Sequence, residues 1–175
     1  MSQLDQLLTA QKTNQQSIID VDEPVVKLVI FRLADQYFAF YGAVIKEVIP
    51  GDTKVYFLPA MPASVEGVMN IRGDIESVIS LYELLQLSAV VNRATATASS
   101  ILLGKTNAMH SGLRVDQLLD VVDVPTSQLQ PPPPSLPEYL QPFVTSLLVF
   151  NGLPVTLLDL DAVFLNWLKG QSKAE

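Results

Sequence analysis

Few residues in this chain are of the types that carry out catalysis. Cysteine is absent and the single histidine is His110, so no second histidine or cysteine can complete a metal site or form a catalytic pair with it. His110 lies beside a predicted hairpin turn, where we expect an ordinary surface residue. The glycine patterns that cradle phosphates, G-x-x-x-x-G-K and G-x-G-x-x-G, do not occur.

Carboxylates occur in three groups, none of which has the setting of an acid–base pair. One group lies on a polar flank, one punctuates a predicted strand and one contains a predicted helix cap; they are Asp20/Asp22/Glu23, Asp116/Asp120/Asp123 and Asp159/Asp161. Carboxylates that share acid–base work need mutual burial, of which the sequence shows no sign. We therefore expect no enzymatic activity, no bound metal and no cofactor.

The most distinctive charged residue is Arg72, which sits directly against Gly73 in a polar turn of the stretch Gly67–Leu81. Glycine allows backbone torsions that side chains forbid, so the stretch predicts a β-hairpin with the arginine at its tip. A guanidinium there offers several donors to carboxylates or helix C-terminal carbonyls of a partner. The alternative is a solvated ion pair with Asp74 or Glu76 of the same turn.

The elements that position this turn are short runs of β-branched and aromatic residues separated by turn residues, which predict strands. Besides the two arms of the hairpin, the expected strands span residues 25–33, 37–41, 43–50, 54–58, 101–104, 111–115, 116–124, 145–149 and 155–158. Ser80 and Glu83 have the spacing of a capping box and predict a short helix. Asp159 is expected to cap a terminal helix, whose apolar face consists of Leu160, Val163, Phe164, Trp167 and Leu168.

The hairpin recurs 79 positions further along the chain, where Gly73 corresponds to Gly152 and both copies lead into a capped helix. A looser echo relates Ala43–Pro50 to Leu118–Pro125. The chain therefore consists of two similar β-rich halves of about 75 residues, and many short strands with little helix predict small barrels. Asn151 stands in place of Arg72 in the second copy, so the hairpin itself does not require the arginine.

The remaining segments are interpreted as connections. Residues 1–24 are polar and expected to form a flexible extension, although the helical spacing of Leu4, Leu7 and Leu8 leaves open a helix docked on the body or on a partner. The run Pro131–Pro134 is expected to form a stiff loop between subdomains; a ligand for an SH3-type domain is the alternative. Residues 169–175 are expected to be a loose tail.

Composition narrows the choice of partners. The net charge is −7 and no stripe of lysine and arginine occurs, which disfavours nucleic acid and anionic lipid surfaces and favours a protein partner. No secretory signal precedes the body, and charges or turn residues interrupt every apolar run before it could span a membrane. An apolar content of 49% suits a packed, soluble domain.

The segment Val65–Gly73, followed by Val78–Leu81, resembles the signature of the CheW family of chemosensory adaptor proteins. Further blocks resemble the family in the same order: an opening hairpin over 29–41, Val44–Val48, Gly112–Asp116 with Val121–Val122, and Leu157–Leu160. The resemblance covers about residues 25–168.

The resemblance implies an all-β fold of two five-stranded SH3-like barrels sharing a core, with a short C-terminal helix. The first barrel is expected at about residues 38–100, and the second at about 25–37 plus 101–168. The implied function is non-catalytic scaffolding in the cytoplasm, at the inner face of the membrane. Such an adaptor couples the cytoplasmic tip of methyl-accepting chemoreceptors to the CheW-like regulatory domain of a CheA-type histidine kinase. An adaptor of type IV pilus (twitching) motility is the alternative to flagellar chemotaxis.

The same resemblance implies which residues form contacts. The receptor-binding positions are Glu47, Gly67, Asn70 and Arg72, and the kinase-binding positions are Val48, Ile49 and Val55. The chain departs from the family pattern at Ser77, Ser80 and Glu76. Ser80 can cap a helix where the family has aspartate, whereas Glu76 replaces an apolar residue and is expected to alter the response to one partner.

Overall fold

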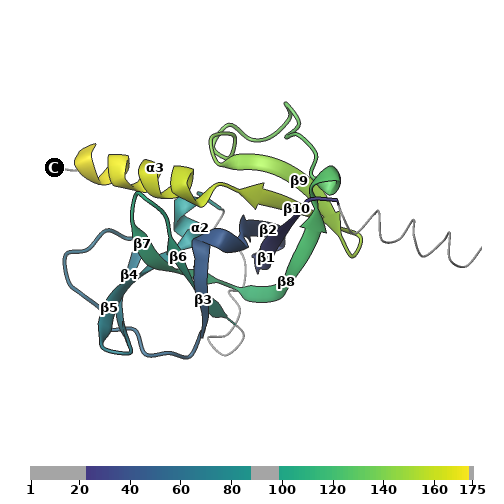
Figure 1. The fold of residues 1–175 in the computed structure, drawn as a ribbon. Helices are drawn as coiled ribbons and strands as arrows, with labels where there is room; N and C mark the ends of the chain where they lie inside the picture. Colours follow the sequence, from purple (N-terminus) through teal and green to yellow (C-terminus); the bar gives the residue numbers. More distant parts are fainter. Residues whose placement is uncertain (1–22, 88–98, 174–175) are drawn as a thin grey trace, which may run out of the picture.

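A computed structural model describes residues 23–87 and 99–173 of the chain. The predicted N-terminal extension, including Leu4, Leu7 and Leu8, lies outside the described residues. The described parts contain two five-stranded β-sheets, two α-helices and two 3₁₀ turns (Figure 1). No helix among these residues has the length and apolar character needed to cross a bilayer.

One sheet combines the start and the end of the chain, in the order β8-β1-β2-β10-β9. Strands β1 and β2 form an antiparallel hairpin, β10 runs parallel to β2, and β9 and β8 are antiparallel to their neighbours. The bounds are β1 Val25–Leu33, β2 Gln36–Tyr41, β8 Gln117–Pro125, β9 Val144–Phe150 and β10 Leu153–Leu158.

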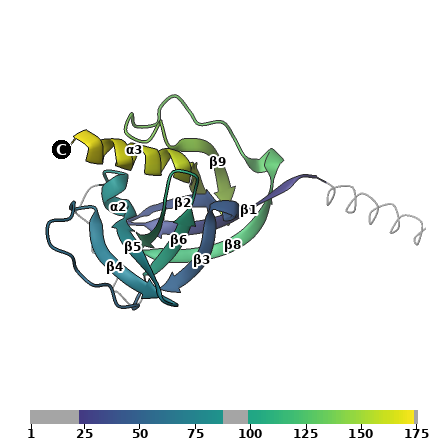
Figure 2. The same ribbon diagram turned by 60° about the vertical axis from the view of Figure 1, so that its left-hand side comes forward.

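The second sheet lies between these parts in the sequence and has the order β3-β6-β7-β5-β4. It also contains a central antiparallel hairpin, β6–β7, with a parallel neighbour, β5. The bounds are β3 Ile45–Pro50, β4 Val65–Ile71, β5 Asp74–Ser80, β6 Ser100–Lys105 and β7 His110–Val115. Figure 2 shows this sheet curving in front of β1 and β2.

The two sheets have the same topology, which confirms the internal repeat. Strand β3 corresponds to β8, the β6–β7 hairpin to β1–β2, and the β4–β5 hairpin to β9–β10. The two turns also share their backbone conformation, because φ is 52° at Arg72 and 49° at Asn151, and it is positive at both following glycines.

Among the described residues, one bridge in each barrel joins an edge strand to the segment that follows the opposite edge strand. In the first barrel (β3–β7) Tyr56 pairs with Val68 of β4, with N···O distances of 2.7 and 2.9 Å. In the second barrel (β8, β1, β2, β10, β9) Gln130 pairs with Leu147 of β9, at 2.7 and 2.8 Å. The predicted fold class, two five-stranded barrels that are mainly β, is confirmed.

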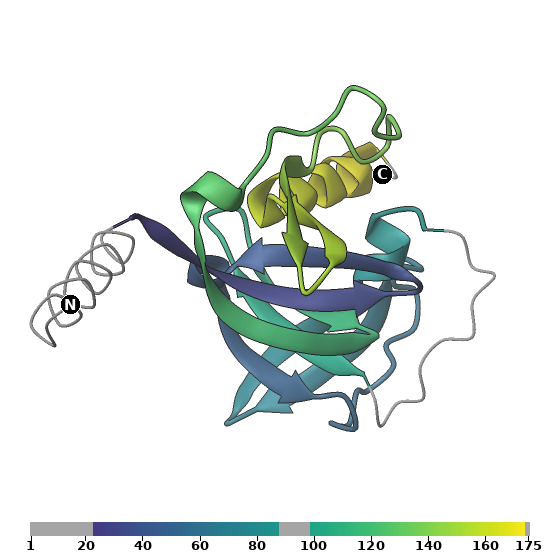
Figure 3. The same ribbon diagram turned by 90° about the vertical axis from the view of Figure 1, so that its right-hand side faces the viewer.

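The helices lie where the caps predicted them. Helix α2, Leu81–Leu84, begins after Ser80, whose Oγ accepts the amide of Glu83 at 3.4 Å. Helix α3, Leu160–Lys173, follows Asp159, whose carboxylate accepts the amide of Ala162 at 3.3 Å. Figure 3 shows α3 lying above the sheet that contains β1 and β2.

The largest core cluster is shared between the two barrels. Phe31, Phe38 and Phe40 of the second barrel pack with Leu102 of the first and with Phe164 of α3, and all five side chains are buried. Smaller clusters fill the interior of each barrel. Because the barrels share their main core, they form one folding unit rather than two independent ones.

Four expectations about boundaries are wrong. Residues 54–58 form a loop with one bridge at Tyr56 rather than a strand. Helix α3 continues to Lys173, so residues 169–173 are helical and not a loose tail. Strand β2 belongs to the second barrel and the β6–β7 hairpin to the first, so the predicted division at residues 38 and 101 is misplaced. The Pro131–Pro134 run connects β8 and β9 of one sheet and does not link the barrels.

Gly67 is predicted to be essential to the closure of the first barrel. A Cβ at this position would lie 2.1 Å from the carbonyl oxygen of Tyr56, so Gly67→Ala must open the bridge. We expect a loss of more than about 1 kcal/mol in the free energy of unfolding, measured by urea denaturation. Gly170→Ala, where a Cβ meets nothing within 4 Å, is the control and should gain roughly 0.5–1 kcal/mol. An equal effect of the two substitutions would contradict this role for Gly67.

Candidate binding site around Arg72

Arg72 and Gly73 form the two-residue turn between β4 and β5, with φ values of 52° and 91°. A hairpin turn with two positive φ values is type I′, and asparagine or glycine normally occupies its first position because other side chains are strained there. The second barrel follows this rule with Asn151 and Gly152. Arginine is thus a costly choice for the turn, which indicates a role for its side chain rather than its backbone.

Asn70 supports this turn. Its side-chain oxygen accepts the amide of Gly73 at 2.9 Å, which fixes the loop at the point where Arg72 projects. Asn70 therefore acts on the backbone of the turn.

The guanidinium of Arg72 pairs with Glu47 of β3. Arg72 Nη1 donates to Glu47 Oε2 at 2.9 Å, and Nη2 donates to Oε1, so the contact is bidentate. Arg72 forms no ion pair with Asp74 or Glu76, the alternative partners within its own turn. The pair joins the β4–β5 turn at one edge of the first sheet to β3 at the opposite edge. The Arg72 side chain is 74% exposed and Glu47 30%, so the guanidinium remains accessible to a partner.

The pair stabilises both charges. The hydrogen bonds from Arg72 lower the pKa of Glu47, and the carboxylate of Glu47 raises the pKa of Arg72. Both groups are therefore ionised near neutral pH, and Glu47 holds the guanidinium in one orientation while most of it faces solvent.

Gly67 has a different setting from the other predicted receptor positions. It lies at a bulge in β4, directly beneath the backbone of Tyr56, with φ of 155°. Glycine is required here because the 51–64 loop approaches β4 closely. Gly67 thus shapes the surface beside Arg72 without presenting a side chain.

The predicted kinase-binding residues do not form one surface. Val48 is exposed and Val55 is half-buried, but Ile49 is only 3% exposed and packs with Met69, Val78 and Ile101. Adjacent residues of a strand point to opposite faces, so Val48 and Ile49 cannot both face a partner. The assignment of Ile49 to an exposed contact surface is corrected, because Ile49 is a core residue.

The sequence analysis missed an apolar surface in the neighbouring loop. We define the apolar loop surface as the exposed side chains of Tyr56, Phe57, Leu58 and Met61, of which Phe57 is 78% exposed. The loop is anchored at its ends, because Arg114 donates to the carbonyl of Gly51 at 2.9 Å and Trp167 donates to Ser64 at 2.8 Å. The composition of residues 54–58 predicts a strand, so it does not indicate that these side chains are exposed. Pro59 and Pro62, which follow, are the signal in the sequence for a loop.

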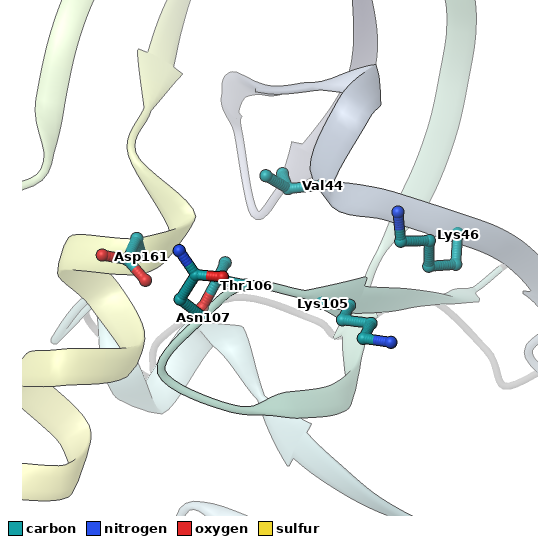
Figure 4. Close-up of a pocket in the computed structure, with 6 residues that line it drawn as sticks. All are labelled: Val44, Lys46, Lys105, Thr106, Asn107 and Asp161. Carbon is teal, nitrogen blue, oxygen red and sulfur yellow. The ribbon is translucent and has the colours of Figure 1, made fainter.

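A pocket of about 390 Å³ lies between the first barrel and the start of α3 (Figure 4). It is lined by β3, by the β6–β7 turn and by the first turn of α3, through Val44, Lys46, Lys105, Thr106, Asn107 and Asp161. Among the described residues neither lysine takes part in an ion pair, whereas one oxygen of Asp161 is buried without a hydrogen-bond partner. Figure 4 shows the two lysines at one end of the pocket and Asp161 at the other.

His110 is not an isolated surface residue. Its Nδ1 lies 2.8 Å from a carboxylate oxygen of Glu76, so the unusual glutamate of β5 has a partner on β7. In the part of the chain that the structure describes, no group of three or more histidine, aspartate and glutamate residues could hold a metal ion.

The paired barrels thus present a fixed arginine, a polar pocket and an exposed apolar loop. Comparison with known proteins identifies the family of this chain: a model described as CheW-like domain matches residues 27–166. Because this match covers most of the chain, the chain belongs to the family of CheW-like domains.

Individual relatives agree with this assignment. Chemotaxis protein CheW of Rhizobium meliloti is 28% identical over 138 residues, which cover 79% of this chain and 86% of that protein. Probable chemotaxis protein CheW of Rhizobium etli is 28% identical over 139 residues, with the same coverage of 79% and 86%. The crystal structure of scaffolding protein TtCheW from Thermoanaerobacter tengcongensis has the same fold, with a TM-score of 0.67, 24% identity, and coverage of 78% of this chain and 90% of that chain.

The Arg72–Glu47 pair predicts a pH-dependent stability. Because folding lowers the pKa of Glu47, the pair stabilises the fold above the ordinary pKa of a glutamate and loses this effect as the pH falls through the lowered value. Wild type should therefore melt above Glu47→Gln at pH 7, and the difference in Tm should disappear in acid. In an Arg72→Asn background the same substitution should show no such pH dependence. A difference that persists in acid would contradict the ion pair as its cause.

Proposed function

We propose that this chain is a non-catalytic adaptor that couples chemoreceptors to a CheA-type histidine kinase in a bacterial chemosensory system. Its membership of the CheW-like family supports this function, as do two relatives named chemotaxis proteins and a structural neighbour named a scaffolding protein. The single observation that carries the proposal is Arg72, an accessible guanidinium held in a strained turn that the second barrel builds with asparagine.

The receptor side of the adaptor comprises Arg72, Glu47 and the adjoining pocket. Glu47 fixes one edge of the guanidinium, which leaves its other N–H groups for carboxylates or carbonyls on a receptor helix. Lys46 and Lys105 add two cations without ion-pair partners in the described structure, so an acidic stretch of the receptor tip fits this side. Asn70 and Gly67 act by shaping the turn and the adjacent loop.

The kinase side comprises Val48, Val55 and the apolar loop surface. Exposed aromatic side chains on an anchored loop are typical of interface hot spots, because they bury much area and lose little conformational freedom. The CheA-type regulatory domain is the partner proposed for this side. The adaptor acts in the cytoplasm, where receptor tips and kinase meet. Both relatives carry chemotaxis in their names, and no observation favours an adaptor of twitching motility.

Arg72→Asn separates the role of the side chain from that of the turn, because Asn151 occupies the same conformation in the second barrel. We expect receptor binding to weaken about tenfold or more, measured by co-sedimentation with receptor-containing membranes. Receptor-dependent kinase activation should be lost. The circular dichroism spectrum should not change, and the Tm should fall no further than in Glu47→Gln, which loses the same ion pair.

Lys169→Asn on α3 removes an equal charge from an exposed position and serves as the control. It should leave receptor binding and activation unchanged. Normal activation by Arg72→Asn, or equal losses in the two variants, would remove Arg72 from the receptor contact.

Phe57→Ser tests the kinase side independently. Removing this ring should weaken binding to the isolated regulatory domain of the kinase by at least about fivefold, measured by calorimetry, with receptor co-sedimentation unchanged. Leu165→Ser removes an exposed apolar residue from α3 and is the matched control, expected to bind normally. Unchanged binding by Phe57→Ser would place the kinase contact elsewhere.

A further inference from the structure

The second barrel carries a groove at the place where its edges meet, remote in sequence from Arg72. It has a volume of about 700 Å³ and lies between the 3₁₀ turn Thr126–Gln128, which follows β8, and the β9–β10 hairpin. Figure 1 shows these strands at the end of the molecule away from β4 and β5. The lining is Ser127, Gln128, Gln130, Leu147, Leu148, Val149 and Pro154, so the groove is apolar on the β9 side and polar on the other.

The groove exists because, in the part of the chain that the structure describes, Gln130 and Leu147 form the one bridge between the edges of this barrel. On the N-terminal side of Gln130 the chain turns away from β9 into the 3₁₀ turn. Strand β9 runs on to Phe150 with no strand paired to it on that side among the described residues. Val149 lies opposite Pro154 of β10, which has no N–H to donate. Its own N–H and C=O therefore point away from β10 toward the groove, and its side chain is 67% exposed. A free edge of this kind pairs readily with an extended segment.

The N-terminal part of the chain enters at this groove. The antiparallel pairing of β1 with β8 continues past both strands, because Thr126 donates to the carbonyl of Pro24 at 2.9 Å. The amide of Ser127, which lines the groove, donates to the carboxylate of Glu23 at 3.3 Å. Glu23, the first described residue, thus lies at the rim of the groove.

The sequence preceding Glu23 suits such an edge. Residues 18–22 read Ile-Ile-Asp-Val-Asp, in which Ile19 and Val21 alternate with acids in the period of a strand with one apolar face. Five extended residues span roughly 16 Å, enough to follow the groove from its rim. The tether to Glu23 gives this segment an effective concentration on the order of millimolar at the groove, which favours it over an untethered occupant.

We propose that residues 18–22 of this chain occupy the groove as an added extended segment. Their backbone pairs with Val149, and Ile19 and Val21 pack against Leu147 and Pro154. The extension then covers the open edge of the second barrel, whereas in the first barrel the Arg72–Glu47 pair joins the two edges. Docking there keeps the free edge of β9 away from other chains.

The absence of cysteine allows a direct test on the full chain, since no native thiol can compete with two introduced cysteines. Under mild oxidation, Ile19→Cys with Val149→Cys should form an intramolecular disulfide in most molecules, seen as a mobility shift without reductant. The same pair carrying Val21→Ser keeps the tether but loses the remaining apolar contact, and it should cross-link at least about fivefold more slowly. Equal rates in the two backgrounds, or cross-linked dimers in place of monomers, would overturn the proposal.

Amide exchange of Val149 provides a second measurement without cysteines. In the full chain this amide should be protected, and Ile18→Ser/Ile19→Ser/Val21→Ser should accelerate its exchange by at least about tenfold. The amide of Leu147, which is bonded to Gln130 in either case, is the internal control and should not change. Equal exchange of Val149 in both proteins would show that the segment does not occupy the groove.

Discussion

Closing a five-stranded sheet into a small barrel requires its two edges to be joined, and this constraint decides where the distinctive residues of the chain lie. In the first barrel the join consists of the Tyr56–Val68 bridge, the glycine at position 67 that lets the backbones approach, and the Arg72–Glu47 pair across the same edges. Arg72 is thus held at the rim of the barrel by a contact that also fixes its direction. The geometry that closes the barrel presents the guanidinium to a partner.

Duplication within the chain separates what the fold requires from what is particular to each half. Both barrels use the same strand order and the same left-handed turn, so neither feature accounts for the arginine. The second barrel places Asn151 in that turn and is joined by the Gln130–Leu147 bridge alone, which leaves the groove beside Val149. One half therefore carries the exposed Arg72–Glu47 pair at its rim, and the other an open groove beside Val149.

The sequence predicted features that depend on local pattern, and it failed where distant segments meet. The hairpins, the caps at Ser80 and Asp159 and the repeat follow from turn residues and short-range spacing. Barrel membership depends on the parallel pairing of β2 with β10 and of β5 with β7, which brings together strands far apart in the chain.

Side-chain partners show the same limit. The family resemblance suggested Glu47 as the companion of Arg72, but the pairing of Glu76 with His110 crosses 34 positions and left no local signal. The strand-like composition around Phe57 gave no indication that this loop is exposed. The burial of Ile49 could have been predicted, because Val48 beside it was already assigned to the surface and adjacent strand residues face opposite sides.

The central claim is that Arg72, held by Glu47, contacts the receptor directly. The most direct measurement is the side-chain Nε–H resonance of Arg72 in labelled protein titrated with a soluble fragment of the receptor tip. A contact predicts a saturable shift of this resonance and protection from exchange with water, together with shifts at Lys46 and Lys105. A titration that saturates while the Arg72 resonance stays unshifted and unprotected would contradict the account.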